Sequence, residues 1–239
     1  SIDGETNSGT TYFYRGAVTN NYVSFAGFTW RIVRINENGS VRLLLNEGIN
    51  SNTTYKFNPS DNGYTYMYYS NSDVENGIMK TLDTWYDNNL KNYENYIVDT
   101  DFCEQFKVTS YSDYATAGSV TAPTYDNYIS NFKCSTDDND KGIITSKVGL
   151  LTYDEAVHAG SYYGKSNSSY IKSSKTNWLM SPTGAYSGNR NVNVWSTASS
   201  GSVGFSSVKF SIIVRSVISL NADTMVTGSG TESDPYVVK

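Results

Sequence analysis

The sequence has few of the side chains on which most catalytic and metal sites depend. Its 239 residues include one histidine, two cysteines and four prolines. Cys103 and Cys134 cannot form a structural zinc site alone, because such a site needs four ligands at short intervals. No nucleophile elbow, phosphate-binding loop or dinucleotide fingerprint occurs. His158 falls in a segment with a helical pattern, where a structural histidine is more common than a base. We therefore expect no catalytic residue, no metal and no cofactor.

Charge is also scarce. Charged residues make up 17% of the chain, against about 25% in a typical soluble protein. The net charge is −5, and lysine and arginine are scattered along the sequence. Without a basic patch to neutralise phosphates, we expect no nucleic-acid partner. No apolar run approaches the roughly 18 residues of a membrane-spanning helix, so we expect no membrane span within this chain.

Uncharged polar residues and tyrosine fill the space that charge leaves. The chain contains 21 tyrosines, and aromatic residues reach 14% of the sequence. That content can bury large areas, which excludes a disordered chain. Tyrosine, asparagine, serine and glycine also dominate adaptable binding surfaces. The composition therefore favours a ligand-binding surface, although many of these aromatics are equally suited to a core.

Local patterns predict a mixed α+β domain. The turn at 36–39 contains an Asn-Gly pair that supplies positive φ, and it predicts a hairpin between strands at 28–35 and 40–45. Two capping boxes, in which a hydroxyl and a glutamate satisfy free amides, predict helices. One begins at Ser72 to Glu75 and ends near Leu90, and its predicted core face consists of Val74, Ile78, Leu82 and Trp85. The other begins at Thr152 to Glu155 and stops at Gly160. Further strands are expected at 12–14, 22–25, 147–151, 178–180 (stopping at Ser181-Pro182), 191–196, 209–220 and 235–238.

The two cysteines enclose part of a long irregular segment at 104–147. In an exported acidic chain a disulfide between Cys103 and Cys134 is the natural interpretation, and the alternative is a pair of buried thiols in a cytosolic protein. The acidic cluster at 137–140 has the oxygen density that calcium favours. Lys141 occupies a ligand position, however, so a solvated acidic loop is the simpler interpretation and calcium binding stays open.

Several motifs spread over nearly the whole chain belong together. They are YFYRG at 12–16, NNYVSFAGFTWRIVRIN at 20–36, LDTWY at 82–86, FC at 102–103, VGLLTYDEAVHAG at 148–160, WLMSP at 178–182 and GSGTESDPYVV at 228–238. As a set they resemble a domain of Firmicutes surface proteins, which is similar in fold to C-type lectins and to sulfatase-modifying factors. The resemblance implies one C-type-lectin-like domain over 1–239, with twisted antiparallel sheets, two helices and an irregular insertion around 104–147. It also implies an extracellular location on the cell surface of a Gram-positive bacterium.

The chain departs from these families at informative places. Ser216 stands where the family usually has proline, and His158 replaces a residue that does not titrate. The Glu-Pro-Asn, Gln-Pro-Asp and Trp-Asn-Asp motifs of calcium-dependent lectins are missing, so sugar binding of that kind is not implied. Cys103 and Cys134 lie in the central insertion rather than near the C-terminal part of the fold. The activity of sulfatase-modifying enzymes is therefore not implied either.

These observations predict a non-enzymatic binding or adhesion module. Its ligand would be a glycan or a protein on a host or neighbouring cell. The candidate site is the polar, Gly-rich loop at 183–191 with the strand beside it, because aromatic and arginine side chains are enriched among binding hot spots. Its residues are Tyr186, Asn189, Arg190, Asn191, Asn193 and Trp195. In the alternative, Trp195 faces the core and the loop merely connects two strands.

Two other functions stay open. The chain could be a structural stalk, pilus or surface-layer component without a specific ligand. It could also be a carbohydrate-active enzyme, if Asp99 and Asp101, or Asp154 and Glu155, meet other carboxylates in space.

Overall fold

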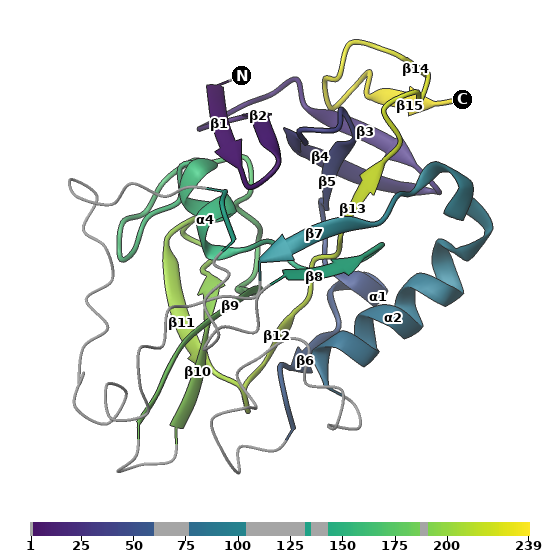
Figure 1. Cartoon of the computed structure of the whole chain (residues 1–239). Coiled ribbons are helices and arrows are strands. Elements are labelled where there is room, and N and C mark those ends of the chain that lie inside the picture. The colour runs from purple at the N-terminus through teal and green to yellow at the C-terminus, as the bar shows by residue number, and fades with distance from the viewer. Residues whose placement is uncertain (1, 60–76, 104–131, 135–142, 187–190) are drawn as a thin grey trace.

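The structure is a computed structural model of the 239-residue chain. It describes residues 2–59, 77–103, 132–134, 143–186 and 191–239 (Figure 1). Within them it is a sheet-rich α+β fold with few helices, which confirms the predicted class.

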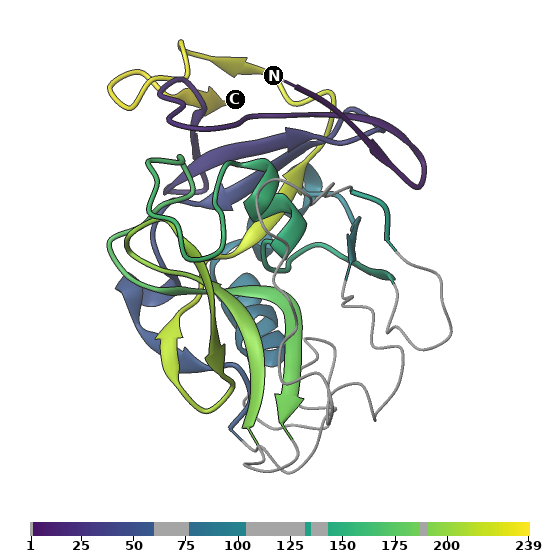
Figure 2. The same cartoon turned by 90° about the vertical axis from the view of Figure 1, so that its left-hand side faces the viewer.

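The larger sheet has eight strands and lies at the end of the molecule where both termini are found (Figures 1 and 2). Along its main path the order is β1 (Ile2–Thr6), β2 (Gly9–Phe13), β4 (Phe28–Ile35), β3 (Tyr22–Phe25), β15 (Tyr236–Val238) and β14 (Val226–Thr227). Strand β4 also pairs with β5 (Val41–Leu45), which in turn pairs with β13 (Val217–Leu220). Strand β15 pairs with β3 in parallel, so the last strand of the chain lies in the sheet beside one of the first.

A second sheet of five strands packs below the first. Its order is β11 (Val203–Ser207), β10 (Asn191–Thr197), β9 (Asn177–Tyr186), β12 (Ser211–Ile213) and β6 (Thr54–Lys56). A separate antiparallel pair consists of β7 (Thr100–Cys103) and β8 (Ile143–Ser146). The helical elements are the single turn α1 (Ile49–Asn52), α2 (Ile78–Asn89), the 3-10 helix η2 (Lys91–Tyr96) and α4 (Tyr153–His158). No helix among the described residues is long and apolar enough to cross a membrane.

The predicted hairpin is confirmed by the antiparallel pairing of β4 with β5. Asn36 and Ser40 close it, since the Asn36 N–H donates to the Ser40 carbonyl at 2.8 Å. Gly39 alone supplies the positive φ, at 82°. A three-residue connection that ends in such a residue is a common hairpin loop, and it projects Glu37 and Asn38 from the sheet.

The core face of α2 is as predicted. Ile78 and Leu82 are fully buried, and Trp85 is 3% exposed. The Trp85 ring packs against Phe28 and Trp30 of β4. Helix α2 follows Gly77, and the predicted capping box at 72–75 lies outside the described residues.

Three strand predictions were wrong in part. Residues 147–151 form no regular strand, and only Gly149 bridges to Val217. Strand β9 continues through Pro182, because a register shift beside Val194 lets a residue without an N–H stay in the sheet. The apolar run at 209–220 divides into β12 and β13, since the chain there crosses from one sheet to the other.

Candidate functional site

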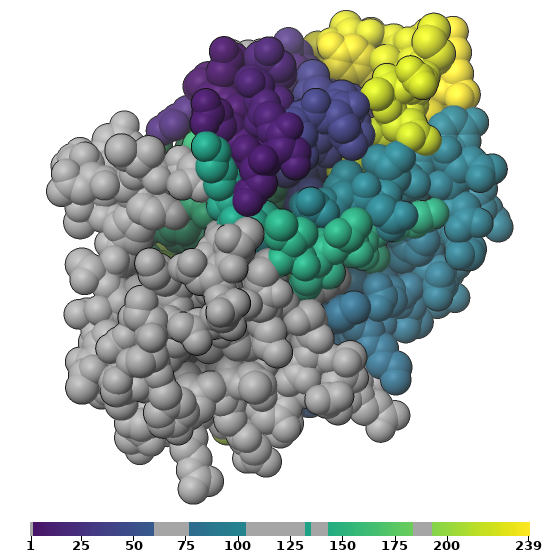
Figure 3. All heavy atoms as spheres, viewed as in Figure 1, coloured from purple at the N-terminus to yellow at the C-terminus, as the bar shows by residue number. Residues whose placement is uncertain are grey.

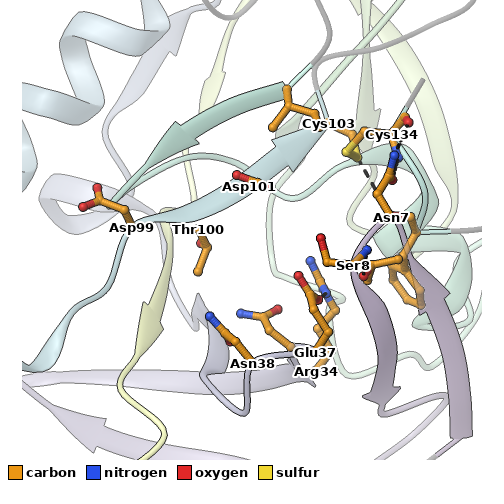
Figure 4. A pocket seen from close by; sticks show the side chains of 14 residues that line it. Asn7, Ser8, Arg34, Glu37, Asn38, Asp99, Thr100, Asp101, Cys103 and Cys134 are labelled. Atoms are coloured by element: carbon orange, nitrogen blue, oxygen red, sulfur yellow. Dashed lines mark hydrogen bonds and ion pairs between the residues drawn. A yellow bond between two sulfur atoms is a disulfide. The ribbon is translucent and has the colours of Figure 1, made fainter. Parts of the chain in front are cut away.

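A polar cavity of about 130 Å³ lies where three chain segments meet. Residues 6–8 come from the end of β1 and its turn, residues 34 and 36–38 from the end of β4 and its turn, and residues 99–101 and 103 from β7 and the residue before it. Phe132, Cys134 and Ile143 complete the lining. Figure 4 shows Glu37 and Asn38 on one side, Asn7 and Ser8 on another, and Asp101 across from them. In Figure 3 the purple N-terminal hairpin lies directly above the surface of β7 and β8.

A disulfide closes one corner of the cavity. Cys103 and Cys134 are bonded, with their Cα atoms 5.1 Å apart, so the predicted bridge is present. The side chain of Asn7 reinforces it from the β1–β2 turn. Asn7 donates to the carbonyl of Cys134 at 2.9 Å and accepts from its N–H at 2.6 Å. The bridge and this amide together hold β7, segment 132–134 and the N-terminal hairpin in one arrangement.

Behind the cavity lies a buried ionic cluster centred on Glu155. Its carboxylate contacts Arg42 Nε at 2.7 Å and Arg34 Nε at 3.1 Å, and all three residues are at least nine-tenths buried. Burial alone would raise the pKa of Glu155, but the two guanidinium groups and a backbone N–H outweigh it and lower that pKa. Burial lowers the pKa of Arg42 to about 10, so Arg42 stays charged at neutral pH.

The same glutamate fixes the start of α4. Glu155 Oε2 accepts from the Thr152 N–H at 3.0 Å, and Thr152 Oγ1 accepts from the Glu155 N–H at 3.1 Å. This is the predicted capping box, and it satisfies two amides that the helix leaves free. Helix α4 is thus tied directly to β4 and β5 through the two arginines.

The arginines connect this cluster to the cavity wall. Arg42 lies 4.0 Å from the ring centre of Phe102 and donates to the Asp101 carbonyl at 3.2 Å. Arg34 lies 5.2 Å from the ring centre of Phe132 and 3.8 Å from the Glu37 carboxylate. Of the three charged groups in the buried cluster only Arg34 lines the cavity, and it is already paired with Glu155.

The rim carries three exposed carboxylates, Glu37, Asp99 and Asp101. Asp101 accepts a hydrogen bond from Thr145 at 2.8 Å. The structure thus brings Asp99 and Asp101 to one cavity with Glu37, whereas Glu155 is committed to buried ion pairs. Among the described residues, no three His, Cys, Asp or Glu side chains are grouped closely enough to hold a metal ion. The acidic cluster at 137–140 lies outside those residues.

The structure describes only part of the loop site predicted from sequence. Trp195 is 1% exposed and Asn193 is 6% exposed, so neither offers a surface to a ligand. Trp195 is buried because it packs against Tyr153, with ring centres 4.4 Å apart, as the alternative interpretation expected. The backbones of Tyr186 and Asn191 pair at the open end of β9 and β10, and Asn189 and Arg190 lie outside the described residues.

His158 has the structural surroundings expected of it. Its ring stacks on Phe132 at 4.0 Å and meets Phe13 edge-on at 4.6 Å. Sequence alone did not indicate Asn7, Ser8, Glu37 and Asn38 as site residues, since the last two predict only a turn. The sequence does contain two polar hairpin turns at these positions, but no local sequence pattern indicates that both turns face the same cavity.

Comparisons with protein-family models, with curated proteins and with solved structures found no match to this chain.

Proposed function

We propose that this chain is a non-enzymatic binding module of C-type-lectin-like fold, displayed on the surface of a Gram-positive bacterium. It binds a glycan or a protein through the polar cavity between the β1–β2 turn, the β4–β5 turn and β7. The observation that carries the proposal is the cavity itself, whose rim combines carboxylates, amides and hydroxyls while Arg34, its one lining arginine, is already paired with Glu155. Its surroundings are held by a disulfide, which suits an oxidising location.

The location of the functional groups favours binding over catalysis. Arg34 and Arg42 are both paired with the buried Glu155, so these three groups act as a support rather than as reacting groups. The groups that remain accessible at the rim are carboxylates and neutral polar side chains. Such a set recognises a polar ligand by hydrogen bonds and charge.

Binding can be tested with the oxidised full chain on an array of glycans and of bacterial and host surface proteins. The double variant Asp99→Asn with Asp101→Asn removes two rim charges without changing side-chain size. It should weaken binding of any ligand found by about tenfold or more, because hydrogen bonds to charged groups are among the stronger ones. Asp87→Asn with Asp223→Asn removes two exposed charges elsewhere and should leave binding unchanged.

Each alternative has its own result. Retained affinity in the Asp99/Asp101 variant would place the site elsewhere. Absence of any ligand on the array would favour a structural stalk, pilus or surface-layer role. Release of reducing sugar from a polysaccharide, lost in the same variant, would instead identify a carbohydrate-active enzyme.

A further inference from the structure

We infer that the cavity recognises a protonated amino group on a hydroxyl-rich ligand, namely a glycan that contains unacetylated amino sugars. This inference rests on the proposed function, because it names the ligand class of the same site. Three observations carry it: the charge balance of the rim, an unpaired acceptor in the lining, and the free polar groups beside them.

The charge balance of the cavity is negative. Arg34 and Arg42 are opposed by Glu155 behind the cavity, and the rim then adds Glu37, Asp99 and Asp101. Counting the six groups, two positive and four negative charges leave a net charge of −2. The rim carboxylates do not converge with other ligands on one metal position among the described residues. A cation that belongs to an extended organic molecule fits this spread better than a single ion.

An orphan acceptor lies in the same lining. Asn36 is 5% exposed, and its Oδ1 is buried without a hydrogen-bond partner among the described residues. A buried carbonyl oxygen without a donor costs free energy. Oδ1 itself has almost no accessible surface, so a ligand N–H recovers that cost once the lining moves to admit it.

The orientation of the Asn36 amide follows from its neighbours. The Ser40 N–H donates to Asn38 Oδ1 at 3.0 Å, so that atom is an acceptor. Ser40 Oγ lies 2.6 Å from the same oxygen and must therefore donate to it. Ser40 Oγ is left to accept from Asn36 Nδ2 at 2.8 Å. Asn36 consequently keeps its nitrogen toward Ser40, and the unpaired atom of its amide is the oxygen.

Neutral groups beside these acceptors suit the hydroxyls of a sugar. Ser8 Oγ and Asn38 Nδ2 line the cavity and are not used in a hydrogen bond between described residues. Both can pair with hydroxyl oxygens, while the carboxylates accept from an ammonium group. The site as a whole is rich in acceptors with a few donors at its edge, which matches an amino sugar better than an anionic one.

The test is calorimetric titration of the oxidised full chain with the tetramer of glucosamine and with its fully N-acetylated counterpart. Acetylation removes the positive charge and leaves the hydroxyls. We expect the glucosamine tetramer to bind at least tenfold more tightly, and its affinity to fall as salt is raised. Glu37→Gln and Asp101→Asn should each weaken it by about tenfold, because each removes a charged acceptor. Asp87→Asn removes an exposed charge on α2, away from the cavity, and should leave the affinity for the glucosamine tetramer nearly unchanged.

The outcomes separate this inference from the proposed function. Equal binding of the two tetramers, or full affinity in both Glu37→Gln and Asp101→Asn, would overturn the amino-group inference. Absence of glucosamine-tetramer binding would also overturn it. In each case a different array ligand that depends on Asp99 and Asp101 would still support the proposed function.

Discussion

At the scale of single residues, Glu155 connects more of the molecule than any other described carboxylate. One oxygen contacts Arg34 and Arg42, and the other caps α4 through the Thr152 N–H. Burying three charges is unfavourable by itself, and their mutual contacts offset that cost. Removing Glu155 leaves both arginines without this compensation.

The substitution Glu155→Gln should therefore be strongly destabilising. Glutamine preserves shape and a cap acceptor but leaves two buried guanidinium groups without a counter-charge, which typically costs about 3–5 kcal/mol. Chemical denaturation measures the loss. Glu37→Gln is the matched control, because its exposed carboxylate lies 3.8 Å from Arg34 and such pairs contribute about 0–1 kcal/mol. Similar losses in the two variants would contradict the central role of Glu155.

The lowered pKa of Glu155 also predicts how the stability of the fold depends on pH. The folded state lowers the pKa of Glu155 below its ordinary value of 4.5, so the unfolded chain binds this proton more readily. Its contribution is fully present above pH 4.5 and is lost as the pH falls through the folded pKa. Denaturation midpoints measured from neutral to acid pH should fall less steeply in Glu155→Gln than in the natural sequence. Parallel curves would show that other groups control acid unfolding.

This cluster shows which part of a site a sequence can predict. The capping box was predicted because Thr152 and Glu155 are three residues apart and belong to one helix start. The ion pair with Arg34 joins residues 121 positions apart, and no local pattern indicates it. Arg34 occupies an alternating strand, where the sequence gives no sign that its guanidinium group is buried beside a carboxylate.

At the scale of elements, the cavity is a product of two hairpin turns and a short strand pair. The β4–β5 turn was predicted because an Asn-Gly pair and alternating strands are local signals. The pairing of β7 with β8 was not predicted, because the two strands are separated in sequence by most of the irregular insertion. Strand β9 is longer than predicted, because a bulge in the neighbouring strand lets Pro182 remain in the sheet.

The disulfide is the link that holds these elements together. Cys103 and Cys134 are separated by 31 residues, and closing a loop of that length stabilises a protein by about 3.5–4 kcal/mol. The double variant Cys103→Ala with Cys134→Ala should lose about that amount in chemical denaturation. Intact mass under non-reducing and reducing conditions should differ by two hydrogen atoms in the natural sequence, because reduction of the bridge adds one to each sulfur. Two free thiols in oxidised protein would contradict the bridge.

At the scale of the whole molecule, the chain crosses between its two main sheets at residues 214–216. Strand β12 belongs to one sheet and β13 to the other, so this short connection joins them. A continuous β-branched run predicted a single strand there, because periodicity alone does not tell where a chain changes sheets. The cavity was unpredictable for the same reason. Asn7 and Cys134, which close it, are 127 residues apart in sequence.

Arg215 holds this crossing in place. Its side chain is 1% exposed, and it donates from Nε to the Leu45 carbonyl at 2.8 Å and from Nη1 to the Ile171 carbonyl. Burial lowers its pKa to about 10, so it stays charged at neutral pH. One planar guanidinium group thus joins the end of β5 to the segment before β9, a geometry that a lysine ammonium does not reproduce.

Arg215→Ala should therefore destabilise the entire fold. It removes a buried side chain and leaves two interior carbonyls without donors, which together should cost about 3–5 kcal/mol. Arg215→Lys should recover less than half of that loss, because an ammonium group is a compact charge without the fixed fork. Lys172→Ala, an exposed neighbour of Ile171, is the control and should move the denaturation midpoint little. If Arg215→Lys matched the natural sequence, charge alone would be the requirement. An unchanged midpoint in Arg215→Ala would show that the two sheets are held together without this side chain.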